Sequence, residues 1–341
     1  MKKRVLALLM CVLLVATMAV GCGEKKDNKD DSKATTADSS SDSSKDLITI
    51  GFSQVGAESD WRVANTESMK AALSEENGFK LIFADAQQKQ ENQTKAVRDF
   101  ISQEVDVIVI APVTETGWET VLGEAKDAGI PVIIVDRMID VSDDSLYSCW
   151  VGSDFKQEGV DAANWLVEYM NKQGTGDAEH NVVVLQGTIG SSAEIGRTKG
   201  FDETIAGFTN YNVLEEQTGE FTQAKGQEVM EAFLKKYDNI DVVIAQNDNM
   251  AFGAIDALKA AGKTPGKDVV IVSFDAVKAA FDSMIAGDMN VSVECNPLHG
   301  PRVAELAKKL MAGETVEKIQ YVEEGVYPAE TAAQELPNRQ Y

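Results

Sequence analysis

Short apolar runs alternate with longer segments of helical periodicity from Leu47 to the end of the chain. The apolar runs are four to nine residues long and end at Gly, Pro, Asn or Asp, which is typical of buried strands. We predict strands over 48–55, 79–85, 105–112, 131–136, 145–152, 181–187, 211–218, 241–246, 268–274, 289–295 and 318–326. We predict helices over 61–77, 89–103, 115–128, 154–172, 191–206, 222–236, 249–261, 276–286 and 299–312. Strict alternation of this kind indicates parallel sheets built from βαβ units.

The alternating pattern divides into two sets of similar length. With 341 residues, the chain exceeds the roughly 250–300 residues at which single cores stop growing. We therefore predict an α/β fold of two doubly wound parallel-sheet lobes, residues 47–150 plus 296–326 and residues 151–295 plus 327–341. Crossings near 150–153, 295–298 and 326–328 would form a three-segment hinge, which permits closure around a ligand through a few backbone rotations.

The first 46 residues read as a targeting region. A basic start at Lys2, Lys3 and Arg4 precedes an apolar stretch that is shorter than the roughly 20 residues of a membrane span. Residues 1–21 resemble a bacterial lipoprotein signal, with Cys22 as the lipidated first mature residue; a plain secretory signal cut nearby is the alternative. Residues 22–46 are polar and low in apolar content, as in a disordered tether. The expected location is extracytoplasmic, with the membrane contacted only through the lipid anchor.

Charge and cysteine usage narrow the class of protein further. The formal net charge is −23, which disfavours nucleic acid because phosphates need Lys and Arg partners. Cys149 and Cys295 lie in strand-like runs and are interpreted as small buried residues, although a disulfide between them remains open. We expect no metal site, because His180 and His299 have no further ligand at metal spacing.

Polar groups follow the predicted strands again and again, and the carboxyl ends of parallel strands share one crevice where ligands bind. The motifs of enzymes with this kind of sheet do not appear, neither G-x-S-x-G nor a Walker loop, and GFSQVGAES stands where G-x-G-x-x-G would be. An acid–base pair of Asp136 and Asp275 is the remaining catalytic alternative. The pattern favours a chain that holds a ligand, without catalysis and without a cofactor.

The strand-end residues suit a small polyol. Arginine forks and carboxylates bind neighbouring hydroxyls in pairs, and aromatic rings cover the apolar C–H face of a sugar. The polar candidates are Arg62, Asp136, Arg137, Arg197, Asn247 and Asp275. The aromatic candidates are Trp61, Phe221 and Phe274. A strand-end Asp is also a common helix cap, and we expect Trp118 and Trp150 to pack in the core or hinge.

Longer runs extend this interpretation to a known family. The chain contains GFSQVGAESDWR (51–62), ADAQQKQENQTKAVRDF (84–100), LQGTIGSSAEIGRTKGF (185–201) and AQNDNMAFGAIDALKAAG (245–262). With these runs it resembles the periplasmic sugar-binding proteins of ABC transporters, in the ribose/galactose (type I) group, and within that group the galactofuranose-binding members. The resemblance implies ligand contacts at Glu58, Ser59, Asp60, Trp61, Arg62, Asp136, Arg137, Arg197, Phe221, Asn247 and Asp275. Asp60 stands where we expect glycine, and Cys295 stands where ribose-binding relatives keep a glutamine.

These inferences give one expected function. The chain would be a monomeric, lipid-anchored receptor that captures a monosaccharide, with galactofuranose as first choice, and delivers it to the permease and ATPase of an ABC importer. Ribose, galactose or arabinose are alternative ligands. A sugar-sensing receptor for a kinase or chemotaxis system would use the same pocket and is the alternative function.

Overall fold

The computed structural model describes residues 47–341. The predicted signal, the lipidation at Cys22 and the tether lie outside the described residues. Within residues 47–341, no helix combines the length and the apolar character that crossing a bilayer requires.

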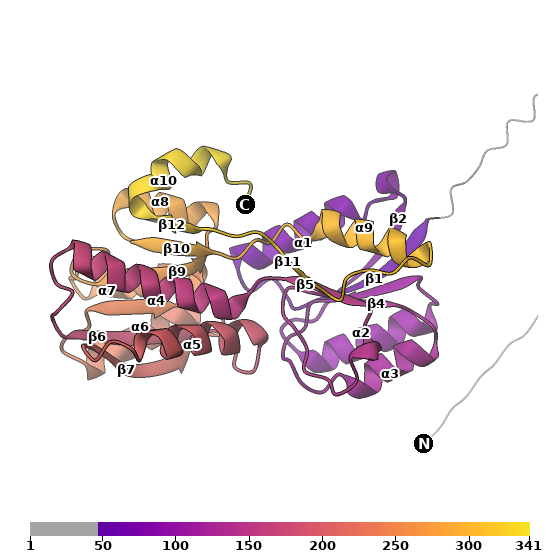
Figure 1. Ribbon diagram of the computed structural model, residues 1–341, viewed down its shortest axis with the longest axis horizontal. Coiled ribbons are helices and arrows are strands. Elements are labelled where there is room, and N and C mark those ends of the chain that lie inside the picture. The colour runs from indigo at the N-terminus through magenta and orange to yellow at the C-terminus, as the bar shows by residue number, and fades with distance from the viewer. Residues whose placement is uncertain (1–46) are drawn as a thin grey trace, which may run out of the picture. The chain divides into compact units, whose positions relative to one another are not determined.

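Two six-stranded sheets organise the described residues into two α/β lobes (Figure 1). The first sheet has the order β11-β5-β4-β3-β1-β2, and all of its pairings are parallel. Its strands are β1 (Ile48–Gln54), β2 (Phe79–Asp85), β3 (Val107–Ile110), β4 (Val132–Val135), β5 (Cys149–Gly152) and β11 (Ile319–Tyr321). We call this half of the molecule lobe 1.

The second sheet has the order β12-β10-β9-β8-β6-β7. Its strands are β6 (His180–Gln186), β7 (Tyr211–Thr218), β8 (Val242–Ala245), β9 (Val270–Asp275), β10 (Val291–Glu294) and β12 (Val326–Pro328). Only β12 runs antiparallel, against β10. We call this half lobe 2, and the predicted pair of lobes with parallel-sheet cores is confirmed.

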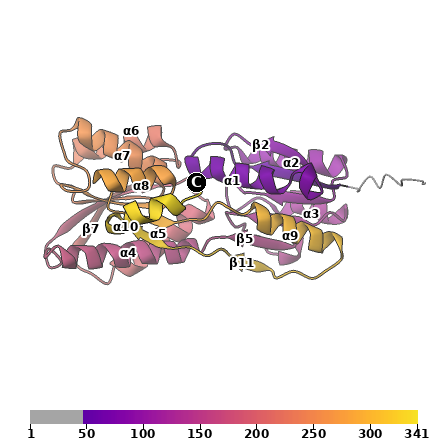
Figure 2. The ribbon, with the colours of Figure 1, turned by 90° about the horizontal axis from the view of Figure 1, so that it is seen from above.

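Helices cover both faces of each sheet, because alternate strand residues point to opposite faces. In lobe 1, α1 and α9 lie side by side on one face (Figure 2), and α2 and α3 cover the other. In lobe 2, α4 and α5 cover one face, and α6, α7 and α8 cover the other. The helices are α1 (Asp60–Ala72), α2 (Gln90–Ser102), α3 (Glu119–Asp127), α4 (Phe155–Lys172), α5 (Ser192–Ile205), α6 (Gln223–Lys236), α7 (Asp248–Ala260), α8 (Lys278–Ala286), α9 (Gly300–Met311) and α10 (Ala329–Glu335). Three short 3-10 helices complete the fold: η1 (Glu75–Asn77), η2 (Asp144–Leu146) and η3 (Leu336–Asn338).

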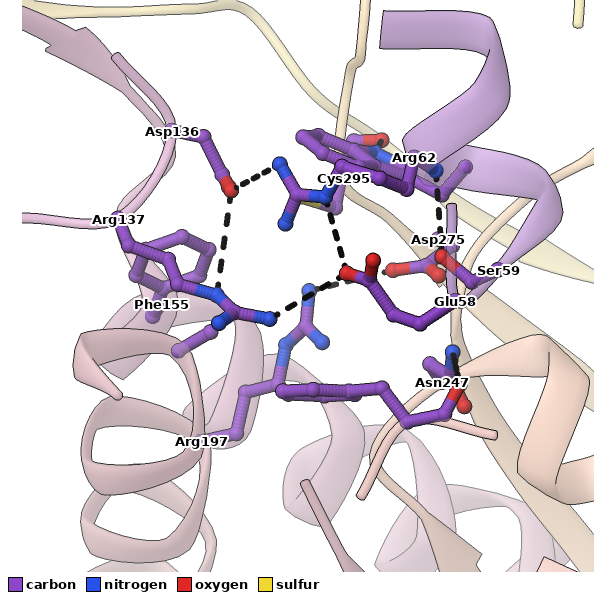
Figure 3. Close-up of a pocket in the computed structure, with 13 residues that line it drawn as sticks. Glu58, Ser59, Arg62, Asp136, Arg137, Phe155, Arg197, Asn247, Asp275 and Cys295 are labelled. Carbon is purple, nitrogen blue, oxygen red and sulfur yellow. Dashed lines mark hydrogen bonds and ion pairs between the residues drawn. The ribbon is translucent and has the colours of Figure 1, made fainter. Parts of the chain in front are cut away.

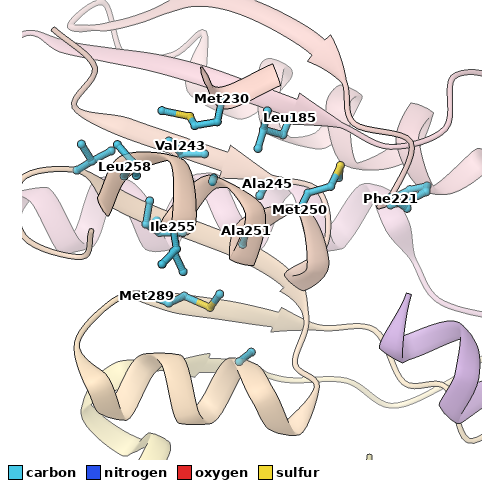
Figure 4. Close-up of a cluster of buried hydrophobic side chains, with 14 of the residues drawn as sticks. Leu185, Phe221, Met230, Val243, Ala245, Met250, Ala251, Ile255, Leu258 and Met289 are labelled. Atoms are coloured by element: carbon cyan, nitrogen blue, oxygen red, sulfur yellow. The ribbon is translucent and has the colours of Figure 1, made fainter. Parts of the chain in front are cut away.

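The core of lobe 2 has two layers, because successive side chains along each strand point to opposite faces of the sheet. Val243 and Ala245 of β8 pack with Met250 and Ile255 of α7 (Figure 4). Val242 and Ile244, one position away along the same strand, pack in the layer under α4 and α5. A strand that is buried on both faces has to be apolar throughout, which is why these segments read as unbroken apolar runs.

The C-terminal tail departs most from the sequence prediction. The single strand expected over 318–326 is two short strands, β11 and β12, that pair in different sheets. The helix α10 was not predicted, because a seven-residue segment shows too little periodicity to stand out. The apolar run at 145–152 contributes only Cys149–Gly152 to its sheet, after the 3-10 helix η2.

Three segments run between the two sheets. One follows β5 and leads into α4, one follows β10 and leads into α9, and one joins β11 to β12. The two aromatic residues expected in core or hinge are both buried: Trp118 is fully enclosed at the start of α3, and Trp150 lies on β5. The two cysteines of the described chain, Cys149 and Cys295, are both buried and free, so they form no disulfide.

Candidate functional site

One pocket collects polar and aromatic side chains from both lobes (Figure 3). Its free cavity volume is only about 20 Å³, far below the roughly 300–1,000 Å³ of typical ligand pockets, so the side chains nearly fill it. Its lining consists of Glu58, Ser59, Trp61, Arg62, Asp136, Arg137, Phe155, Ala193, Arg197, Phe221, Asn247, Asp275 and Cys295.

Lobe 1 contributes the first turn of α1. Ser59 is the N-cap, and its side chain accepts a hydrogen bond from the backbone N–H of Arg62 at 3.1 Å. This cap starts the helix so that Trp61 and Arg62 lie on its first turn, at the edge of the sheet where β1 ends. Both side chains are buried, and the Arg62 guanidinium lies 4.6 Å from the centre of the Trp61 ring.

Two arginines and two carboxylates form the polar wall of lobe 1. Arg62 pairs with Glu58 at 3.0 Å through Nε and with Asp136 at 2.7 Å through Nη1. Arg137 lies 3.7 Å from the same Glu58 oxygen. The other oxygen of Glu58, Oε2, is buried and has no hydrogen-bond partner among residues 47–341. A buried carboxylate oxygen left in this way is an acceptor still available to a ligand hydroxyl.

Lobe 2 contributes Arg197 from α5 and two strand-end residues. Arg197 pairs with Glu158 of α4 at 2.6 Å and with Asp275, the last residue of β9, at 3.4 Å. Asn247 caps α7, since its side chain accepts from the N–H of Met250 at 2.9 Å. Its amide also donates to the carbonyl of Phe221 at 3.1 Å, so the cap of one helix holds the pocket's aromatic loop.

Aromatic rings supply the apolar surface. Trp61 reaches from lobe 1 into the apolar cluster of lobe 2, and its Nε1 donates to the carbonyl oxygen of Cys295 at 2.6 Å. Phe221 and Phe155 line the pocket from lobe 2. The expectation for Phe274 is wrong: it lies outside the lining, packed in the layer beneath α4 and α5. Neighbouring residues of a strand point to opposite sides of the sheet, so Phe274 points away from the pocket when Asp275 lines it.

Three pocket residues have backbone conformations that non-glycine residues rarely adopt. The φ angles are +61° at Asp136, +61° at Phe221 and +103° at Asp275. Such strain costs on the order of 1–3 kcal/mol per residue and persists where surrounding structure enforces it, commonly at ligand sites. Two of the three, Asp136 and Asp275, stand where β4 and β9 end. The unusual backbone there changes the direction of each carboxylate from the one that a regular strand would give it.

Burial and charge pairing set the ionisation of the site. Burial alone would lower the pKa of Arg62, but Asp136 and Glu58 outweigh it and raise that pKa above its ordinary value. Burial and the neighbouring Arg62 lower the pKa of Arg137 to about 10. Burial would raise the pKa of Asp136, yet the two arginines hold it below its usual range. Arg62, Arg137 and Asp136 are therefore charged at neutral pH, which gives the strong charge-assisted hydrogen bonds that polyols accept and donate.

Asp275 behaves differently from Asp136. Its burial raises its pKa well above the ordinary value, and Arg197 offsets this only in part. Nearby Asp248 and Glu158 add to the rise. The lobe 2 side of the pocket thus holds more carboxylates than one arginine neutralises.

Ten of the eleven predicted contact residues line the pocket, as the list above shows. The exception is Asp60, which is exposed and outside the lining, while its backbone N–H donates to Asn249 of lobe 2 at 3.0 Å. Sequence reasoning missed Phe155, Ala193 and Cys295. Phe155 and Ala193 begin helices and are apolar, so no polar strand-end pattern marks them, and Cys295 reads as a buried strand residue.

Comparison with known proteins places this geometry in a family. The sequence pattern of the periplasmic binding protein domain matches residues 50–315. The chain therefore belongs to the periplasmic binding protein family, which is the family expected from its motifs.

Particular relatives are close over most of the chain. The galactofuranose-binding protein YtfQ of Escherichia coli (strain K12) is 47% identical over 296 residues, which cover 86% of this chain and 91% of that protein. A crystal structure of a galactofuranose-binding protein superposes with a TM-score of 0.82 at 47% identity, covering 86% of this chain and 98% of that one. A binding protein of the arabinose ABC transporter from Shewanella sp. ANA-3, bound to L-arabinofuranose, gives a TM-score of 0.81 at 47% identity, covering 86% and 95%.

Proposed function

We propose that this chain is the extracytoplasmic, lipid-anchored binding protein of an ABC importer, and that it captures a monosaccharide in furanose form. The observation that carries the proposal is the pocket itself. Paired arginines and carboxylates reach it from both lobes, and indole and phenyl rings line the remainder. Such a lining matches a neutral ring whose edge carries hydroxyls and whose face carries C–H groups.

Charge balance supports a neutral ligand. Arg62, Arg137 and Arg197 are already paired with the carboxylates around them. An anionic ligand would have to displace those carboxylates, whereas a hydroxyl can donate to a carboxylate and accept from a guanidinium without breaking the pairs. Glu58 Oε2, free of partners within the described chain, is the first acceptor for such a hydroxyl.

Galactofuranose is the first choice of ligand. Two relatives at 47% identity are named for galactofuranose or were solved with arabinofuranose, and both rings are five-membered. One face of such a ring can lie on Trp61 or Phe221, which line the pocket.

Lobe closure is the proposed mechanism of capture. Lobe 1 would move as one body and lobe 2 as the other, about the three segments that join the sheets. A sugar held by Arg62 and Asp136 on one side and by Arg197 and Asp275 on the other favours the closed state by its higher affinity for that state. The permease and ATPase of the importer would then receive the sugar from the closed form.

Isothermal titration against furanoses and pyranoses tests the ligand, and native mass spectrometry of freshly purified protein identifies any sugar that co-purifies. We expect one site per chain and tighter binding of galactofuranose than of ribose. Asp136→Asn should weaken binding at least tenfold, because it removes the buried partner of Arg62. Asp60→Asn, at an exposed position outside the lining, is the matched control and should keep the affinity. If no aldose in the panel gave a measurable heat of binding, the proposal would be overturned.

A further inference from the structure

A second cluster of chemically active side chains lies at the junction of the three segments that join the lobes. Cys295 follows β10, Glu324 lies between β11 and β12, and Glu158 is on the first turn of α4. Their ligand-forming atoms, one sulfur and two carboxylate oxygens, all lie within 4.8 Å of one another. Among residues 47–341, this is the one such group of three found.

The hydrogen bonds around the cluster hold its members in place. Glu324 Oε1 accepts from the Ser153 hydroxyl at 2.5 Å and from the backbone N–H of Asn296 at 2.8 Å. The same Ser153 oxygen lies 3.3 Å from the Cys295 sulfur. Ser153, Asn296 and Glu324 come from the three different crossing segments, so the cluster lies where all of them meet.

Glu158 adds an independent sign of a missing partner. Its side chain is 3% exposed, and Oε2 pairs with Arg197. Its other oxygen, Oε1, is buried and has no nitrogen or hydroxyl donor among residues 47–341; the thiol of Cys295 is the neighbouring donor. A buried carboxylate oxygen without a nitrogen or hydroxyl donor costs free energy, and a cation bound at the cluster would supply the partner.

A cavity borders two of the three members of the cluster. A cavity of about 490 Å³ is lined by both Glu158 and Glu324, together with Asp154, Asp161 and Glu294. Of these, Glu294 is paired with Arg339.

From this arrangement we propose that Glu158, Cys295 and Glu324 form a binding site for Zn²⁺ that ties together the three segments between the lobes. Zinc accepts one thiolate with carboxylate oxygens in a tetrahedral set, whereas Mg²⁺ and Ca²⁺ prefer oxygen alone. Tetrahedral ligands at zinc bond lengths are about 3.5 Å apart, so a small contraction of these side chains completes the site. The Ser153 hydroxyl or a water takes the fourth position.

Direct metal titration of the mature chain, residues 22–341, tests the site, in a Cys22→Ser background so that the N-terminal thiol does not contribute. After chelator treatment, the protein competes with a chromophoric indicator for added ZnCl₂. We expect one zinc per chain, and at least tenfold weaker binding in Glu324→Gln. Glu323→Gln, which removes an exposed carboxylate one position away, is the matched control and should bind like the parent.

Cobalt supplies a readout of the thiolate that does not depend on any glutamate variant folding. CoCl₂ should give a near-ultraviolet sulfur-to-cobalt charge-transfer band in the parent, and Cys295→Ser should lose it. A parent that binds no zinc in competition, a cobalt complex without that band, or equal zinc affinities in parent and Glu324→Gln would overturn the proposal. Because no sugar is used, either result leaves the proposed sugar-binding function to its own test.

Discussion

Gly187 directly follows β6, and its missing side chain makes room for the Phe221 ring. A β-carbon built on Gly187 would overlap the Phe221 ring at Cζ and both Cε atoms. The backbone of Gly187 is outside the left-handed region, so alanine would be free of backbone strain there. Gly187→Ala is therefore a purely steric perturbation of one pocket wall.

The size of the effect follows from where the ring can go. Phe221 is only 5% exposed, and its main chain is held by Asn247, so the ring can move only by turning toward the pocket that it lines. Overpacking of this kind costs about 1–3 kcal/mol. In the unliganded protein the displaced Phe221 ring can occupy part of the pocket, which relieves most of that cost. A bound sugar needs the same part of the pocket, so the cost appears as weaker binding. We expect the affinity to fall by about 5- to 150-fold.

Isothermal titration with the preferred sugar and thermal unfolding without it separate the two effects. Gly187→Ala should lose affinity with little change in Tm. Gly123→Ala is the control, because a β-carbon at Gly123 in α3 meets nothing within 4 Å; it should keep the affinity and gain about 0.5–1 kcal/mol of stability. A double-mutant cycle with Phe221→Ala should be non-additive. Wild-type affinity in Gly187→Ala, or full additivity in the cycle, would refute the reasoning.

Three further predictions address other contacts of the site. Trp61→Phe removes the bond from Nε1 to the Cys295 carbonyl and leaves that buried oxygen unpaired, so urea unfolding should show a loss of about 1–3 kcal/mol; an unchanged midpoint would contradict it. Burial lowers the pKa of His299 from 6.5 to about 4, so the unfolded chain takes up a proton before the folded one as pH falls. Between pH 6.5 and 4 the wild type should therefore lose about 3 kcal/mol more of its unfolding free energy than His299→Gln, and parallel pH profiles would show that His299 has no such role. Arg197→Lys cannot keep both Glu158 and Asp275 paired, and titration should show at least tenfold weaker sugar binding, whereas retained affinity would exclude Arg197 from the site.

Local pattern was sufficient for most of the architecture. Apolar runs and helical periodicity predicted both sheets and nine of the helices, because a strand buried on both faces and an amphipathic helix each leave a periodic trace in the chain. Strand ends also indicated the pocket, since parallel strands deliver their carboxyl ends to one edge. The short tail elements β11, β12 and α10 were not predicted as such, because each is too short to show a periodic pattern of apolar residues. Each also forms only against a partner in another part of the fold.

Only the tertiary structure decided which strand-end groups face the pocket and what joins them. The positive φ angles at Asp136, Phe221 and Asp275 are imposed by packing. None of these residues is a glycine, so the sequence does not predict them. Trp61 and Cys295 are 234 positions apart, and Glu158, Cys295 and Glu324 come from three distant segments. Contacts of that separation arise when the lobes assemble, so the sequence determined the elements and the chemistry they carry, and long-range packing determined which of those groups meet.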